Sequence, residues 1–125
     1  MVFAENNKAI YLQIVDKIGD DVLAGNYPEE CRLPSVREYA SAVEVNANTV
    51  MRAYDALASQ GIIYNRRGVG YFTALGAREK VLRQRREYFF NNEIGRFFRQ
   101  LQLLDVSAGN LVEMYNEYCS KNQIK

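Results

Sequence analysis

Four polar residues between positions 46 and 52 have the chemistry and the spacing to bind nucleic acid, namely Asn46, Asn48, Thr49 and Arg52. A helix advances by about 100° per residue, which places Asn48 and Arg52 one turn apart on the same face. Their amide and guanidinium groups can hydrogen-bond to base edges and to phosphates. We expect Arg52 to read sequence, because its fork of donors matches the O6 and N7 atoms of guanine. A phosphate clamp, which binds all sequences alike, is the alternative.

A short amphipathic helix from Asn46 to Gly61 must position these groups. Asn46 is a favourable N-cap and Gly61 suits a left-handed C-cap, so both ends of the helix are defined. Apolar residues on the opposite face predict burial of Val50, Ala53, Tyr54 and Leu57. An ordinary amphipathic helix with a solvated polar face has the same pattern, so the flanking sequence decides between the two interpretations.

Two helices and a connector make up the sequence before this helix. Apolar residues at every fourth position predict the first helix over 8–25, and two prolines interrupt the connector over 26–34. Ser35 and Glu38 form the pattern of a capping box, which begins a second helix that ends near Glu44. Because only a tight turn separates this helix from the next cap, the sequence predicts a helix-turn-helix.

A basic hairpin follows the helix-turn-helix. The hydrophobic period changes from 3.6 to 2, and residues 62–65 and 71–73 are strand candidates around Arg66, Arg67 and Gly68. Such a hairpin is a wing that can lie along a minor groove, where negative potential attracts arginine. A surface hairpin whose arginines only keep it soluble is the alternative.

The C-terminal part is expected to be helical and to form a dimer. Residues 77–104 lack proline and predict a long helix, and Ser107 can cap another. These helices carry more aromatic surface than they can bury alone, so we expect a second chain to cover Tyr88, Phe89, Ile94, Phe97, Phe98 and Leu101. Folding back onto the winged part is the alternative. The basic run over 78–86 is either a solvated helix face or a contact to phosphates.

Composition limits the fold and excludes several functions. With 125 residues, of which 48% are hydrophobic, the chain can form one core plus a helical appendage. The expected fold is mainly α with a small β-hairpin: a winged helix-turn-helix domain over 1–76, then a helical dimerisation region over 77–125. The sequence has no histidine, and Cys31 and Cys119 stand far apart, which excludes a Cys/His metal site and a Ser/His or Cys/His catalytic pair. We expect free thiols, no metal, no cofactor and no enzymatic activity.

Charge and hydropathy indicate where the protein acts. The net charge is +1, and residues 1–76 hold seven Lys and Arg against nine Asp and Glu, so a DNA contact must be a local basic patch. No apolar run is long enough to span a membrane, and the N-terminus does not resemble a signal peptide. We therefore expect a cytoplasmic protein.

Several spaced motifs together resemble the winged helix-turn-helix domain of the GntR family of bacterial transcription regulators. They are YLQI at 11–14, LPSVRE at 33–38, VNANTVMRAY at 45–54 and RRGVGYF at 66–72. The resemblance covers residues 8 to about 74 and implies a homodimer that binds an operator with two-fold symmetry. It also implies DNA contacts from Arg37, from polar residues over 46–49 and from Gly68 at the tip of the wing.

Three departures from the family pattern bear on these implications. Residues 29–31 replace a common Pro-Gly-Asp, so the connector can take a different path. A glycine is common where Glu44 stands; if the turn is kept, Glu44 adopts a left-handed conformation at a cost of roughly 1 kcal/mol. Relatives often have arginine at positions 47 and 51, whereas this chain has Arg52. That feature resembles the YtrA-type branch, which has a short helical dimerisation region.

The candidate DNA contacts are Ser35, Arg37, Asn46, Asn48, Thr49, Arg52, Arg66, Arg67 and Gly68. The expected partners are double-stranded operator DNA and a second copy of the chain; the sequence indicates no effector. The expected function is therefore that of a transcriptional repressor. A winged-helix adaptor that binds other proteins is the alternative, but it would more often carry apolar groups on this helix and wing.

Overall fold

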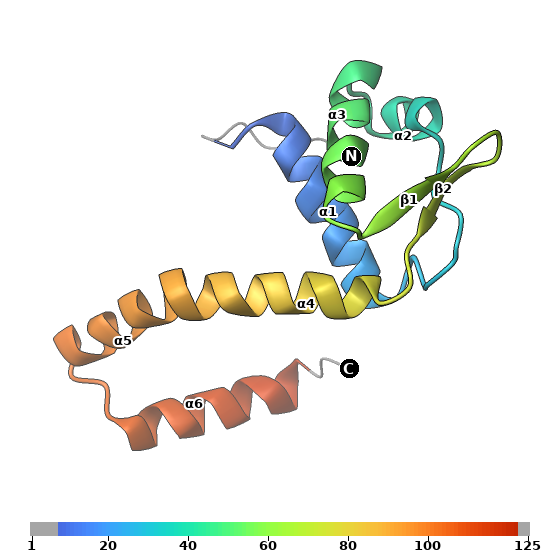
Figure 1. Cartoon of the computed structure of the whole chain (residues 1–125). Helices are drawn as coiled ribbons and strands as arrows, with labels where there is room; N and C mark the ends of the chain where they lie inside the picture. The colour runs from blue at the N-terminus through green and yellow to red at the C-terminus, as the bar shows by residue number, and fades with distance from the viewer. Residues whose placement is uncertain (1–7, 123–125) are drawn as a thin grey trace. The chain divides into compact units, whose positions relative to one another are not determined.

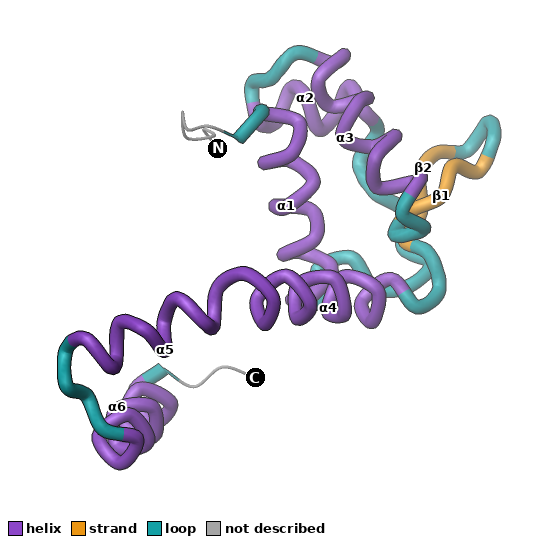
Figure 2. Tube along the Cα trace, turned by 60° about the vertical axis from the view of Figure 1, so that its left-hand side comes forward, coloured by secondary structure: helices purple, strands orange, loops and turns teal. Residues whose placement is uncertain are grey.

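The computed structural model describes residues 8–122, which divide into two compact units between residues 84 and 85. In order, the first unit contains α1 (Ile10–Ala24), α2 (Val36–Val43), α3 (Ala47–Ser59), β1 (Ile63–Arg66), β2 (Gly70–Thr73) and the start of α4 (Ala77–Tyr88) (Figure 1). The second contains the end of α4, a π-helical turn (Phe89–Glu93), α5 (Ile94–Leu103) and α6 (Ala108–Lys121). Figure 2 shows that the two strands form a single hairpin and that the other described elements are helices. The expected mainly helical fold with a small hairpin is therefore confirmed.

Helices α1, α2 and α3 form the core of the first unit, because each buries the apolar face of its sequence pattern. All four predicted residues of α3 are buried, namely Val50, Ala53, Tyr54 and Leu57. They join one cluster with Ile14, Ile18 and Val22 of α1 and with Tyr39, Ala40 and Val43 of α2. The polar face of α3 is consequently left outside the core.

Local hydrogen bonds define the helix-turn-helix. Ser35 and Glu38 form the predicted capping box at the start of α2. Glu44 follows α2 in a left-handed conformation, with φ 57° and ψ 50°, so the turn is kept without glycine. Asn46 then caps α3, because its side-chain oxygen accepts a hydrogen bond of 2.7 Å from the Asn48 backbone N–H.

The connector between α1 and α2 runs along the hairpin. β1 and β2 pair as the predicted antiparallel strands. The Leu33 backbone N–H donates to the Tyr71 carbonyl at 2.8 Å. The Thr73 N–H donates to the Cys31 carbonyl at 2.9 Å. The connector therefore adds a short third stretch of pairing beside β2, which the sequence pattern did not predict.

The second unit is helical, and none of its described residues is buried. The helix expected over 77–104 is present from 77 to 103. It contains the π-helical turn, in which the Ile94 N–H donates to the Phe89 carbonyl. The expected helix is therefore confirmed, with a local change of period near its middle.

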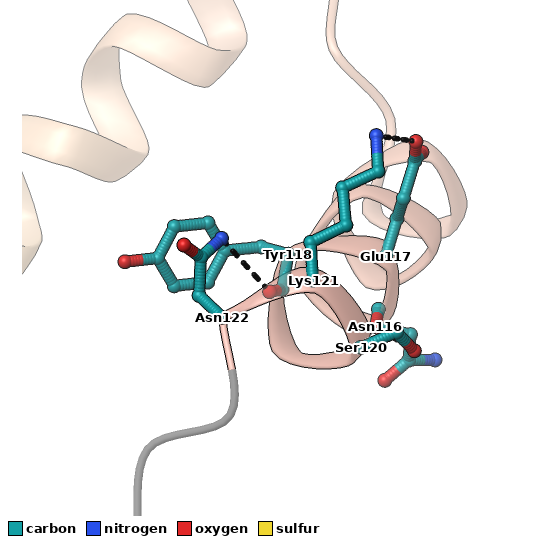
Figure 3. Close-up of polar contacts among 6 residues, drawn as sticks. All are labelled: Asn116, Glu117, Tyr118, Ser120, Lys121 and Asn122. Atoms are coloured by element: carbon teal, nitrogen blue, oxygen red, sulfur yellow. Dashed lines mark hydrogen bonds and ion pairs between the residues drawn. The ribbon is translucent and has the colours of Figure 1, made fainter.

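Helix α6 has defined ends. Ser107 caps its start, as predicted, by accepting a hydrogen bond of 3.1 Å from the Asn110 N–H. Near its C-terminal end, Lys121 pairs with Glu117 at 2.9 Å (Figure 3). Asn122 closes the last turn, because its side chain donates to the Tyr118 carbonyl at 3.2 Å (Figure 3).

The division between the units falls inside α4, whereas the sequence pattern places a boundary at 76/77. Ala77 and Val81 are buried with the core of the first unit, so the first turns of α4 are part of that unit. Both cysteines, Cys31 and Cys119, are free thiols. Over residues 8–122, no helix combines the length and the apolar character needed to cross a membrane.

Candidate nucleic-acid interface

The outward face of α3 presents the polar groups that its sequence places there. Asn48 is exposed and Thr49 is half-buried beside it. The side-chain oxygen of Asn46 is used by the helix cap, which leaves its amide N–H groups for another acceptor. Within residues 8–122, the Asn48 side chain makes no hydrogen bond, so its donor and acceptor can both meet a base edge.

Arg52 is exposed but is not directed straight away from α3. The Cζ atom of its guanidinium lies 4.0 Å from the centre of the Tyr11 ring, which belongs to α1. Sequence periodicity placed Arg52 on the correct face, but it contained no information about this contact.

The start of α2 brings Ser35 and Arg37 to the surface. The Ser35 hydroxyl accepts a hydrogen bond from the Glu38 N–H at 3.1 Å. In return the Ser35 N–H donates to the Glu38 carboxylate, which lowers the pKa of that carboxyl; the Ser35 hydroxyl and Arg32 add to the effect. Arg37 lies one residue into the helix and is exposed.

The two arginines of the wing have different surroundings. Arg66 lies 4.2 Å from the centre of the Phe72 ring, and it donates to the Tyr64 hydroxyl at 3.1 Å. That hydroxyl donates in turn to Glu30 of the connector at 2.6 Å. Arg67 is exposed at the tip, next to Gly68, whose φ of 78° requires the left-handed region. Arg67 is therefore available to DNA, whereas Arg66 stiffens the wing.

Arg32 is a basic residue whose place beside the wing is not indicated by the sequence pattern. It lies in the connector, opposite Phe72, and its side chain runs beside Gly70 at the wing. A Cβ atom at Gly70 would lie 3.1 Å from the Arg32 Nε atom. Arg32 is also close enough to Glu38 to influence its pKa, so it lies between the wing and the start of α2. Only the pairing of the connector with β2 reveals this position.

An aromatic cluster fixes α3 relative to its neighbours. The Tyr54 ring of α3 packs edge-on against Tyr71 of the wing at 5.0 Å and against Tyr39 of α2 at 6.2 Å. Burial raises the pKa of Tyr54 and raises the pKa of Tyr39 to about 12. Helix-turn-helix and wing are thus held together from inside, beneath the polar face.

Part of the basic run over 78–86 has a structural role. The Arg78 side chain donates to the Leu23 carbonyl at the end of α1, at 3.1 Å. Lys80 donates to the Gly61 carbonyl, also at 3.1 Å. Both cations therefore tie the start of α4 to the rest of the first unit, and both satisfy carbonyls near helix ends.

A helix-turn-helix with an outward polar face, followed by a basic hairpin, defines the winged-helix class of DNA-binding proteins. The family model described as "Bacterial regulatory proteins, gntR family" matches residues 10–73. The chain belongs to this family, which confirms the family that its motifs resemble. The family and the similar proteins are transcription regulators rather than enzymes.

Similar proteins extend beyond the winged part. YhcF of Bacillus subtilis, an uncharacterized HTH-type transcriptional regulator, is 31% identical over 109 residues, 87% of this chain and 88% of that protein. The HTH-type transcriptional repressor YtrA of the same organism is 39% identical over 73 residues, 58% of this chain and 56% of that protein. The crystal structure of a GntR-family regulator from Bacteroides thetaiotaomicron has 52% identity and a TM-score of 0.75, and covers 90% of this chain and 98% of that chain.

Proposed function

We propose that the protein acts in the cytoplasm as a homodimeric repressor that binds an operator with two-fold symmetry. In each protomer, α3 enters the major groove and the wing lies along the neighbouring minor groove. The first 76 residues supply the DNA contacts and residues 77–125 supply the dimer. The proposed contacts are Ser35, Arg37, Asn46, Asn48, Thr49, Arg52, Arg67 and Gly68, with Arg66 supporting the wing.

The observation that carries the proposal is an apolar face left uncovered in the second unit. Phe97 and Phe98 are 46% and 51% exposed, and Tyr88 is 60% exposed. Ile94 and Leu101 of α5 are half-buried. Monomeric proteins rarely leave such a patch in water. A second copy can cover it with the same residues, which produces a two-fold axis.

Dimerisation determines the form of the binding site. A two-fold dimer presents two copies of α3, so its preferred DNA has two half-sites related by the same symmetry. With a net charge of +1, a protomer has little non-specific attraction to DNA, and the second α3 supplies the contacts that it lacks. The name of the related YtrA, a transcriptional repressor, supports repression rather than activation.

Selection of bound sequences from random double-stranded DNA tests this function. The expected result is an enriched motif of two inverted half-sites, bound by two chains in sedimentation velocity. A reporter promoter that contains the motif should lose expression when the protein is supplied. A single half-site bound by one chain would contradict the dimer. No enrichment by folded protein would contradict DNA recognition and would favour a protein-binding adaptor.

A further inference from the structure

The stack of Arg52 on Tyr11 brings a recognition-helix side chain against α1. The two helices lie side by side in the first unit (Figures 1 and 2). A groove of about 360 Å³ lies along their contact, and its lining residues are Ala9, Ile10, Tyr11, Asn48, Thr49 and Arg52. The cation of this groove is the guanidinium of Arg52, a group that binds phosphate oxygens.

Stacking fixes the direction of the guanidinium without using its donors. A guanidinium stacks on a ring through its flat face, whereas its five N–H donors lie in the plane of the group. Tyr11 is half-buried and Arg52 is exposed. The ring is therefore held by the packing of α1, while the donors stay accessible. Holding the side chain in advance reduces the entropy that it loses on binding.

We propose that Tyr11 positions Arg52 to bind a backbone phosphate of DNA in this groove. The inference rests on the proposed DNA-binding function. A major groove is about 12 Å wide and a helix with its side chains is about 10–12 Å across. A helix in the groove therefore faces bases in front and sugar-phosphate walls at its sides. The Arg52 side chain, which lies sideways toward α1, therefore reaches the sugar-phosphate backbone. The bases are then read by Asn46, Asn48 and Thr49.

Variants of the full chain test the clamp. Arg52→Ala should weaken binding to the selected operator and to a random duplex by the same factor, roughly eightfold at 0.1 M salt for one lost phosphate contact. The slope of log affinity against log salt should decrease by about 0.9. Tyr11→Leu should reproduce part of this loss, because Arg52 loses its support. Tyr11→Phe keeps the ring and should bind as the wild type does.

A double variant shows whether Tyr11 acts through Arg52. Tyr11→Leu should cost nothing further in a chain that already carries Arg52→Ala. Equal losses in both backgrounds would overturn the inference. Urea denaturation shows whether the Tyr11→Leu chain folds. If it does not fold, the DNA affinity of Arg52→Lys decides whether the inference holds. Lysine keeps the charge but lacks the flat face, so wild-type affinity for Arg52→Lys would also overturn it.

The outcomes separate this inference from the proposed function. If the wild-type chain selects no DNA sequence, the proposed function fails. If the wild type binds its operator but Arg52→Ala weakens only the operator and not the random duplex, Arg52 reads a base. In that case the positioning by Tyr11 toward a phosphate fails while the DNA-binding function stands.

Discussion

The hydroxyl of Tyr54 donates a hydrogen bond of 2.7 Å to the backbone carbonyl of Pro34. Tyr54 is fully buried in α3, and Pro34 directly precedes Ser35, the cap of α2. The bond therefore ties the recognition helix to the start of the preceding helix. Its loss would affect the core and the DNA-binding surface together.

Tyr54→Phe should lower the free energy of unfolding by about 1–2 kcal/mol, because the Pro34 carbonyl loses its partner while the ring still packs. Urea denaturation followed by circular dichroism measures the change. Tyr71→Phe is the matched control, since its hydroxyl makes only a contact of 3.9 Å to the Met51 sulfur. The control should change stability by less than about 0.5 kcal/mol. A loss for Tyr54→Phe no larger than that of the control would show that the Pro34 bond contributes little.

Stability should decrease in alkaline solution. Burial, aided by nearby Tyr27 and Asp21, raises the pKa of Tyr39 from 10.0 to about 12. Between these pH values the unfolded chain has lost a phenol proton that the folded chain retains, so the contribution of Tyr39 is complete below pH 10 and is lost as pH rises toward 12. The urea midpoint should therefore fall above pH 10. Tyr39→Phe should flatten this fall, and an identical slope would contradict the assignment.

Changing Phe97 and Phe98 together to serine should weaken both self-association and operator binding. Buried aromatic anchors at interfaces are often worth about 2 kcal/mol or more, so the dimer dissociation constant should rise at least about tenfold. Sedimentation velocity measures this constant. Leu75→Ser is the control, because Leu75 is 68% exposed in the first unit. An unchanged dimer would place the interface on another surface.

Arg67→Ala should lower affinity for all DNA sequences and flatten the salt dependence by about one unit. The reason is that Arg67 is exposed at the wing tip, where it can meet a phosphate. Arg66→Ala is the comparison and should mainly loosen the wing, because Arg66 is held by Phe72 and Tyr64. A titration of binding against salt distinguishes the two. No change of slope for Arg67→Ala would mean that the wing does not contact the backbone.

Features with a local cause were predictable from the sequence. The caps at Ser35, Asn46 and Ser107 depend on hydrogen bonds within three residues, so residue type and spacing identify them. The left-handed Glu44 was expected from the family resemblance instead, because a glycine is common at this position in the kept turn. These features determine where α2 and α3 begin, and thus which residues form the candidate site.

Contacts between distant segments were not predictable. The pairing of Leu33 with Tyr71 depends on the path of the connector. The hydrophobic period of the sequence contains no information about that path. The placement of Tyr11 beneath Arg52 depends on how α1 packs against α3. Sequence chemistry therefore selected Arg52 as a candidate, whereas its direction became known only from the packing.

The π-helical turn over Phe89–Glu93 has the effect of one added residue within a regular helix. One residue corresponds to about 100° of rotation, and the wider turn removes about the same amount, so Phe97 and Phe98 lie relative to Tyr88 as they would in a regular helix one residue shorter. Deleting Asn91 would remove the extra residue and the wide turn together, so the two phenylalanines should keep their present faces. The turn in this sense absorbs a change of length: a single codon can be lost here without changing which side chains α5 presents to a second chain.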